Sequence, residues 1–256
     1  MPELPDLAVM ASHLDKKLAN HKLNDVKLHV DRKSNATQDE LTNALVGHQL
    51  KSVFREGKEL RFEFAGGNTL GIHLMLHGEI RLKKQGEEIK FPVLKLSFTS
   101  GTLFLTDWQK QATPTLNPEK SNVPDALDID AKWLKGTLAK KKTDVKTVLI
   151  DQKIIRGIGN SYSDEILYDA GISPMSTAKA IPEKQVEVLA KSIHQVLIEE
   201  IQNLMNVSDD LIIGENRDFL KVHLPKTKHT KKGEEILISQ KGSRKTYYVQ
   251  TQQLYK

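Results

Sequence analysis

Apolar residues recur with two different periods along this chain, and the change between the periods divides it into two parts. In the first part they alternate with polar residues, as in residues 60–64 and 94–98, which is the pattern of a half-buried β-strand. From Ala131 to about Met205 they recur instead at helical spacing. The two patterns predict an α+β fold in which a β-sandwich or barrel of short strands precedes a helical part.

Both ends of the chain depart from this division. Pro5 and Asp6 are typical of a first helical turn, and apolar residues follow them at helical spacing, so a helix is expected before the strands. Near the C-terminus, residues 236–238 and 246–249 are short β-type runs on either side of a turn at Gly242. The chain therefore begins with a helix and ends with a β-hairpin.

Proline and asparagine gather in residues 113–130, between the β-type and the helical parts. Such composition is typical of an interdomain linker. We therefore predict an N-terminal β-sandwich domain over residues 1–118 and a linker over 119–130. A helical domain over 131–221 and a C-terminal hairpin over 222–256 complete the predicted organisation.

Composition limits the classes of protein to which the chain can belong. The 256 residues carry a formal net charge of +5 and include no cysteine. A moderately basic chain suits a polyanionic partner without requiring one. The lack of cysteine excludes disulfides, thiol nucleophiles and thiolate-bound metals. Because no apolar run is long enough to cross a bilayer and no signal sequence is evident, we expect a cytoplasmic protein without a membrane partner.

The first residues, Met1-Pro2-Glu3, have chemical potential of their own. Removal of Met1 would leave Pro2 with a free secondary amine, and an α-amino group titrates near ~7.7–8.0, so part of it is neutral at pH 7. Such an amine can attack an aldehyde-like carbon and form an iminium ion, which is an electron sink. The alternative is that Pro5 begins a helix and Pro2 is a stiff chain end, and these residues alone leave both readings open.

Two further motifs are candidates for contacts with anions. In Gly157-Ile158-Gly159-Asn160 the glycines let backbone N–H groups approach an anion, and the helix that follows favours a phosphate at its N-terminus. Asn160 is also a good helix cap and a hydrogen-bond donor. A plain tight turn between helices is the alternative for this short motif. Lys58 stands just ahead of a predicted hairpin, where lysine is usually a solvated charge.

Taken together, these motifs resemble the formamidopyrimidine-DNA glycosylase and endonuclease VIII family. Residues 1–5 resemble its opening motif, and residues 149–174 resemble its helix–two-turn–helix. Residues 242–248 resemble the turn of its C-terminal finger hairpin. The motifs occur in the family's order over essentially the whole chain, so together they are far more specific than any one of them.

The resemblance implies base excision repair of double-stranded DNA that contains a damaged base or an abasic site. Pro2 would attack the deoxyribose C1′ of a nucleotide flipped out of the duplex, and the base would leave. Elimination from the iminium intermediate would then nick the strand. Glu3 would be the general acid/base at the sugar, and Lys58 would complete the catalytic set. The implied DNA-binding residues are Asn160, Arg244, Lys153, Arg156, Gly157, Gly159, Leu76 and Gln109.

The finger departs from the family's pattern, because the usual finger holds zinc with four cysteines. His223 and His229 alone cannot form a four-ligand structural zinc site. We therefore expect a zincless finger and no cofactor. We also expect the protein to act as a monomer in the cytoplasm, at the nucleoid. The side chains expected to hold the finger by packing are Ile236, Ile238, Tyr247 and Val249.

The loops that meet the bases in this family also differ. Leu76 stands where a methionine wedge is common, and residues 107–111 replace a loop whose arginine and phenylalanine contact the orphaned base. The segment 208–222 is short for a full loop over the damaged base. The lesion, the opposite-base preference and the choice between β- and β,δ-elimination therefore stay open. Two alternative functions remain: a non-catalytic binder of damaged or abasic DNA, and an RNA-binding or ribosome-associated protein, which would need nothing from Pro2.

Overall fold

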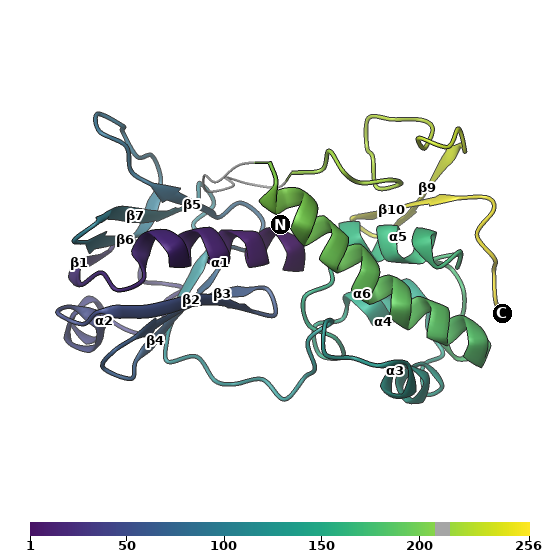
Figure 1. Cartoon of the computed structure of the whole chain (residues 1–256), viewed down its shortest axis with the longest axis horizontal. Helices are drawn as coiled ribbons and strands as arrows, with labels where there is room; N and C mark the ends of the chain where they lie inside the picture. The colour runs from purple at the N-terminus through teal and green to yellow at the C-terminus, as the bar shows by residue number, and fades with distance from the viewer. Residues whose placement is uncertain (208–215) are drawn as a thin grey trace. The chain divides into compact units, whose positions relative to one another are not determined.

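The computed structural model describes residues 1–207 and 216–256 (Figure 1). The chain forms two compact units, the first built on Met1–Lys120 and the second on Ser121–Asn203 and Arg217–Lys256. The expectation of a short loop over residues 208–222 falls partly on residues 208–215, which lie outside the described residues. The predicted α+β architecture is confirmed, since sheets with one leading helix make up the first unit, and helices with a final hairpin make up the second.

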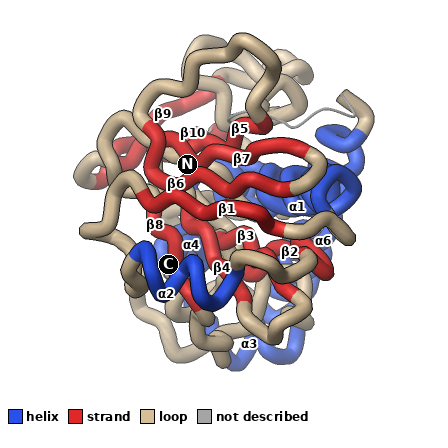
Figure 2. Tube along the Cα trace, turned by 90° about the vertical axis from the view of Figure 1, so that its left-hand side faces the viewer, coloured by secondary structure: helices blue, strands red, loops and turns tan. Residues whose placement is uncertain are grey.

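The first unit is a β-sandwich with helix α1 packed into it. Its strands form two four-stranded antiparallel sheets, in the orders β1-β6-β7-β5 and β2-β3-β4-β8 (Figure 2). The elements are α1 (Leu4–Leu18), β1 (Leu23–Leu28), α2 (Gln38–Leu45), β2 (Leu50–Glu56), β3 (Glu59–Phe64), β4 (Thr69–His73), β5 (Glu79–Leu82), β6 (Pro92–Phe98), β7 (Gly101–Thr106) and β8 (Thr113–Leu116).

One hydrophobic core joins α1 to both sheets. Leu7, Met10 and Leu14 recur along α1 at helical spacing and are almost completely buried. They share this core with Phe62 of β3 and Leu94 of β6, which come from different sheets. Because the helix is fixed by this packing over its whole length, its N-terminus is held in a defined place.

Two elements of the first unit differ from the sequence-based expectation. Helix α2 was not predicted, although Thr37 and Glu40 form a capping box in which the Thr37 N–H donates to Glu40 Oε2 at 2.7 Å. Strand β8 lies in the first part of the proline-rich residues 113–130, inside the predicted domain 1–118, where no strand was expected because of the prolines. It is an edge strand, where proline is tolerated, and it pairs with β4.

The second unit is helical up to the hairpin, as the change of period predicts. Asp130 and Asp144 cap α3 and α4, and each accepts a hydrogen bond of 2.7 Å from a backbone N–H in the first turn. Its elements are α3 (Ala131–Leu138), α4 (Val145–Ile150), α5 (Asn160–Asp169), the 3-10 helix η1 (Ala178–Ala180), α6 (Glu183–Met205), β9 (Ile236–Lys241) and β10 (Arg244–Val249). Among the described residues, no helix has the length and apolarity that a bilayer crossing requires.

Candidate functional site

The first turn of α1 fixes Glu3 beside Pro2. Glu3 is the N-cap residue, with extended backbone angles, and its N–H donates to Asp6 Oδ2 at 2.8 Å. The Leu7 N–H donates back to the Glu3 carbonyl at 3.1 Å. Pro2 is buried, and Glu3 is 3% exposed. The carboxylate and the ring nitrogen of Pro2 therefore belong to adjacent residues whose backbone is held by helix capping.

Lys58 lies in the tight turn between β2 and β3. Gly57 has φ +59°, a left-handed conformation that glycine adopts without strain, and Glu56 and Glu59 pair on either side of the turn. Arg55 Nη1 donates to the Gly57 carbonyl at 2.9 Å and braces the turn. The Lys58 residue is 8% exposed, so it is not the solvated charge that is usual for a lysine in a turn.

The same end of the first unit receives both the N-terminus of α1 and the Lys58 turn. The C-terminal end of α1 lies beside the start of β2, because the Asn20 N–H donates to the Leu50 carbonyl at 2.8 Å, and from there β2 runs back towards the N-terminus of α1. Further along, the Val53 N–H donates to Asp15 Oδ1 at 2.7 Å. With rises of about 1.5 Å and 3.3 Å per residue, the 15 residues of α1 and the seven of β2 each span about 23 Å. The structure thus brings two separately predicted sites to one place.

His73 lies at this end as well, and sequence reasoning did not single it out as a site residue. Leu60 pairs with Ile72, so His73 at the end of β4 is level with the β2–β3 turn. Burial, and then the charge of Lys58, lower the pKa of His73 below its ordinary value. The ring is therefore neutral at pH 7, and its Nδ1 accepts a hydrogen bond of 3.1 Å from the Met75 N–H.

Two loops leave the sheets at this end and carry Leu76 and Gln109. The turn over residues 74–78 is closed by a 2.8 Å hydrogen bond from the Gly78 N–H to the Leu74 carbonyl. A Cβ at Gly78 would lie 2.2 Å from that oxygen, so only glycine fits there. Leu76 is 63% exposed, and Gln109 is also exposed on the loop that precedes β8. Both positions suit contact with a large partner.

In the second unit, the turn before α5 is held by its own side chains. The Gln152 amide donates to the Ile158 carbonyl at 2.7 Å and accepts from the Gly157 N–H at 3.0 Å. Gly157 has φ +103°, a conformation that favours glycine. Gly159 stands at the N-cap of α5, so Asn160 is the first helical residue and not the cap that its residue type suggested.

The two charged residues that flank this turn have different surroundings. Lys153 is exposed. Arg156 Nε donates to the Val123 carbonyl at 2.7 Å, and the backbone N–H of Arg156 donates to the Pro124 carbonyl at 2.9 Å. Arg156 thereby ties the turn to the segment that precedes α3, while a role of either residue in binding DNA stays a prediction.

Asn160 joins this turn to the C-terminal hairpin. Its Nδ2 donates to the Lys245 carbonyl at 3.0 Å. Arg244 precedes Lys245 at the start of β10, is exposed, and pairs with Lys241 across a tight turn. Within the second unit the structure therefore brings together Asn160 and the strand end that carries Arg244, two residues that are 84 positions apart in the sequence.

Asp164 of α5 anchors the hairpin. Its fully buried carboxylate accepts hydrogen bonds from Lys146 Nζ at 2.7 Å and from the Tyr247 N–H at 3.0 Å, and it pairs with His223 Nδ1 at 2.8 Å. Lys146 Nζ also donates to Thr246 Oγ1 at 2.9 Å. The sequence motif contained Asp164, but nothing local to it indicated this role.

Apolar packing also supports the hairpin, largely as predicted. Ile236, Tyr247 and Val249 are buried in a small cluster with Val222. Ile238 was expected in this cluster, but it is 56% exposed. Alternation places Ile236 and Ile238 on the same face of β9, but only Ile236, the first residue of the strand, is buried, so the expectation was wrong for Ile238.

The described part of the chain offers a poor fit to a structural metal. Within residues 1–207 and 216–256, no group of three or more His, Cys, Asp or Glu side chains is arranged to hold an ion. His223, one of the two histidines near the hairpin, is already paired with Asp164. The four-ligand site that a zinc finger requires is therefore not matched by the side chains described here.

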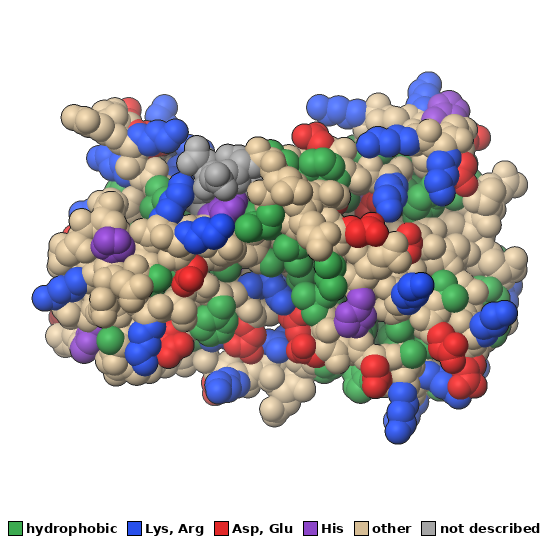
Figure 3. Space-filling model, in the orientation of Figure 1, with side chains coloured by type: hydrophobic (Ala, Val, Ile, Leu, Met, Phe, Trp, Pro, Cys, Tyr) green, Lys and Arg blue, Asp and Glu red, His purple; other side chains and the backbone are tan. Residues whose placement is uncertain are grey.

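Charge alone does not locate the site. On the face seen in Figure 3, lysine and arginine side chains are scattered among acidic and uncharged groups and do not form one continuous basic patch. The candidates for phosphate contacts are therefore individual residues on turns, such as Lys58 and Arg244, whose positions are fixed by the hydrogen bonds described above.

Comparison with known proteins gives matches over nearly the whole chain. Residues 1–113 match the sequence profile of the formamidopyrimidine-DNA glycosylase N-terminal domain, and residues 121–209 match that of the formamidopyrimidine-DNA glycosylase H2TH domain. The formamidopyrimidine-DNA glycosylase of Carboxydothermus hydrogenoformans is 30% identical over 225 residues, with 85% of this chain and 84% of the relative covered. That of Psychromonas ingrahamii is 31% identical over 218 residues, with 79% and 78% covered.

Solved structures agree with these sequence matches. The formamidopyrimidine-DNA glycosylase of Lactococcus lactis, non-covalently bound to DNA containing an abasic site, is similar with a TM-score of 0.87 and 26% identity over 98% of this chain and 99% of that one. A complex of the Lactococcus lactis protein with an N7-benzyl-Fapy-dG DNA gives a TM-score of 0.85 and 26% identity, with 97% and 98% covered.

Proposed function

This chain belongs to the formamidopyrimidine-DNA glycosylase family, and we propose that it is a bifunctional DNA-repair glycosylase that releases a damaged base and then cleaves the strand at the abasic site. Its partner is DNA, as in the related complexes with damaged and abasic duplexes. The base-release activity follows from the family. The strand-cleaving activity is the finer part of the proposal, and it rests on the chemistry of Pro2.

Pro2 is the proposed nucleophile once Met1 has been removed. Its secondary amine forms a bond to C1′ as the bond from C1′ to the base breaks, and opening of the sugar gives an iminium ion. That ion withdraws electrons from C2′, so loss of a C2′ proton expels the 3′ phosphate and nicks the strand. Glu3, on the adjacent residue, exchanges the protons at the sugar as a general acid/base.

The gathering of Pro2, Glu3 and Lys58 at one end of the first unit is the observation that carries this proposal. An ammonium group at the same end of the unit as the proposed nucleophile would attract a phosphate to that end. Burial and the charge of Lys58 keep His73 neutral at pH 7, so of these two side chains the lysine is the one proposed to meet the phosphate as a cation. In the second unit, Asn160 and Arg244 are proposed to hold the phosphates around the lesion.

Trapping with borohydride tests the strand-cleaving activity. Incubation of the protein with an abasic duplex and borohydride should reduce the iminium ion to a stable amine and leave a covalent protein–DNA adduct. The Pro2→Gly variant should lose most of this adduct, whereas Pro5→Ala, which changes the proline inside the first turn of α1, should retain it. Intact-mass analysis of the purified protein should confirm that Met1 is absent.

The second candidate function is a non-catalytic binder of damaged or abasic DNA. It is favoured by one observation, the replacement of the family's base-contacting loop by residues 107–111. Tight binding of the abasic duplex without any adduct, in protein whose Pro2 amine is free, would select this function. We further propose that the protein acts as a monomer and that its hairpin folds without zinc.

A further inference from the structure

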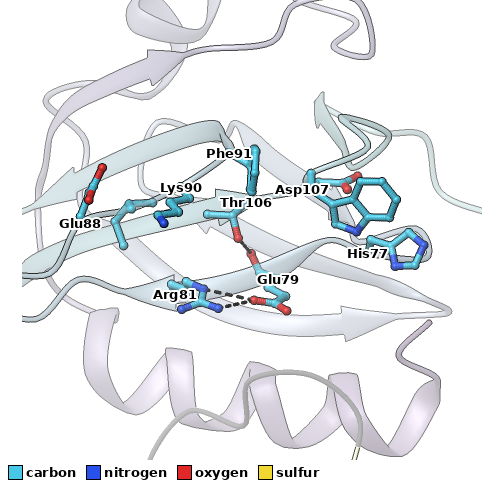
Figure 4. Close-up of a pocket in the computed structure, with 10 residues that line it drawn as sticks. His77, Glu79, Arg81, Glu88, Lys90, Phe91, Thr106 and Asp107 are labelled. Carbon is cyan, nitrogen blue, oxygen red and sulfur yellow. Dashed lines mark hydrogen bonds and ion pairs between the residues drawn. The ribbon is translucent and has the colours of Figure 1, made fainter.

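A pocket of about 360 Å3 opens in the first unit at the end of the sheet that contains β5 and β7 (Figure 4). Its walls come from β5, from residues 88–91, from the end of β7 and from the loop that follows. This volume lies at the lower end of the ~300–1,000 Å3 that is usual for sites of small ligands. None of its lining residues is among those assigned above to the chemistry or to the phosphates.

Two large aromatic side chains at this pocket are exposed. Trp108 is 58% exposed and Phe91 is 56% exposed. The ring of His77, which also lines the pocket, packs against that of Trp108 with a centroid distance of 5.0 Å. Exposed aromatic faces gathered around one hollow suit a flat, aromatic ligand that can stack on them.

The loop that carries Trp108 is rigidly built. The carboxylate of Asp107, which is 2% exposed, accepts hydrogen bonds from the N–H groups of Gln109 at 2.8 Å, Gln111 at 2.7 Å and Ala112 at 2.8 Å. Arg32 adds hydrogen bonds of 3.1 Å to the carbonyls at the tip of the loop. Trp108 is therefore exposed on an ordered loop, so little conformational entropy of the loop is lost when a ligand stacks on it.

Phe91 is held in place at the expense of backbone strain. It has φ +55°, which is uncommon for a bulky residue. The Asp107 N–H donates to the Phe91 carbonyl at 3.0 Å and so connects the two aromatic positions through their backbones. Strained conformations that the surrounding structure maintains are concentrated at functional sites.

The polar groups of the pocket favour an uncharged ligand. Arg81 donates to Glu79 Oε2 from Nε at 3.1 Å and from Nη2 at 2.7 Å, so its charge is matched within the wall (Figure 4). Glu88 and Lys90 add one charge of each sign. A phosphate would meet no excess of positive charge here, whereas a nucleobase offers amino groups to the carboxylates and ring faces to Trp108 and Phe91.

We propose that this pocket binds one unpaired nucleobase of the DNA, stacked on Trp108 and Phe91. The inference rests on the proposed function, because repair of a damaged base leaves unpaired bases in the complex. Leu76 and Gln109, the residues expected to enter the duplex, are direct sequence neighbours of His77 and Trp108, so the pocket lies beside the predicted DNA contacts. The base comes either from the strand opposite the lesion or from the lesion itself.

Three duplexes distinguish these sources when their binding is measured in a Pro2→Gly background, which prevents turnover. The first has abasic analogues on both strands and therefore lacks both bases. The second restores only the base opposite the lesion, and the third restores only a formamidopyrimidine lesion. If a base enters the pocket, its restoration should tighten binding about tenfold, the size of one stacking interaction. Trp108→Leu should abolish that gain, and Trp108→Phe should retain most of it.

The controls separate failure of the pocket from failure of the proposed function. Phe54→Ala removes an aromatic residue that is 41% exposed on β2, outside the pocket, and should leave every gain unchanged. If Trp108→Leu loses the gain in affinity on the second duplex, the base in the pocket is the one opposite the lesion. If it loses the gain on the third duplex, the base in the pocket is the lesion itself. If the parent and Trp108→Leu show equal gains in affinity and both bind abasic DNA tightly, the proposal that the pocket binds a base is wrong. The proposed glycosylase function is not affected by this result. If the parent binds abasic DNA no more tightly than undamaged DNA, both the pocket proposal and the proposed function are wrong.

Discussion

The side-chain amide of Asn160 donates to the backbone carbonyl of Lys245 at 3.0 Å, and this hydrogen bond joins the turn before α5 to the first strand residues after the hairpin turn. Arg244 is the residue before Lys245, so the contact fixes the backbone from which the arginine side chain extends. An amide carries two N–H groups. One is used on Lys245, and the other is the one proposed to donate to a phosphate of the DNA.

Replacement of Asn160 by alanine should therefore weaken binding of abasic DNA about tenfold to a hundredfold, because hydrogen bonds to charged groups contribute about 1.5–3 kcal/mol each. The loss should not add to that of Arg244→Ala, since Asn160 also positions the strand that bears Arg244. Fluorescence anisotropy with the single and double variants measures both effects. Asn24→Ala, an exposed amide on β1, is the control, and strictly additive losses would contradict the coupling.

Local patterns predicted most of the helices and hairpins, because they depend on the period of the apolar residues. Helix α2 has a local signal as well, since Thr37 and Glu40 stand at the spacing of a capping box. No local sequence pattern indicates that Pro2, Lys58 and His73 come together at one end of the first unit. This arrangement depends on pairings such as that of His73 with Thr113, which join residues far apart in the sequence. The hydrogen bonds that Asp164 receives from Lys146 and Tyr247 are long-range in the same way.

Glu3→Gln should separate the two steps of the reaction. The amide keeps the size of the side chain but cannot exchange a proton at the sugar, so release of a damaged base should slow by about a hundredfold to ten-thousandfold. Opening of a preformed abasic site requires only the Pro2 amine and should continue. Single-turnover assays on both substrates with the same protein preparation measure this. Full activity on the damaged base would show that Glu3 is not the acid/base.

Arg244→Ala tests for a phosphate contact at the hairpin. Each phosphate neutralised by a protein cation releases counterions, so the slope of log affinity against log salt should become shallower by about 0.9. Affinity should fall for every DNA sequence, because phosphates carry no sequence information. Lys51→Ala, which removes an exposed cation paired with Glu63 on the first unit, should leave the slope unchanged. An unchanged slope in Arg244→Ala would place Arg244 away from the phosphates.

His73 should make stability depend on pH. Its pKa is lowered in the folded protein by burial and by Lys58, so between this value and the ordinary 6.5 the unfolded chain binds more protons. The free energy of unfolding should therefore decrease as the pH falls below about 6.5. In His73→Gln this decrease should be smaller, as urea denaturation from pH 8 to pH 5 would show. The pKa of His29 is also lowered, but its effect is present in both proteins and cancels.

The hairpin should be stable without metal and dependent on Asp164. Because this carboxylate accepts from Lys146 Nζ and from the Tyr247 N–H and pairs with His223, Asp164→Asn leaves buried groups without a matched partner. Breaking a buried ion pair costs about 3–5 kcal/mol, so the melting temperature and the affinity for DNA should both fall. A chelator should change neither quantity in the parent protein, and metal analysis should find far less than one zinc per chain. A chelator that lowered the melting temperature would mean that a metal, and not Asp164 with its partners, holds the hairpin.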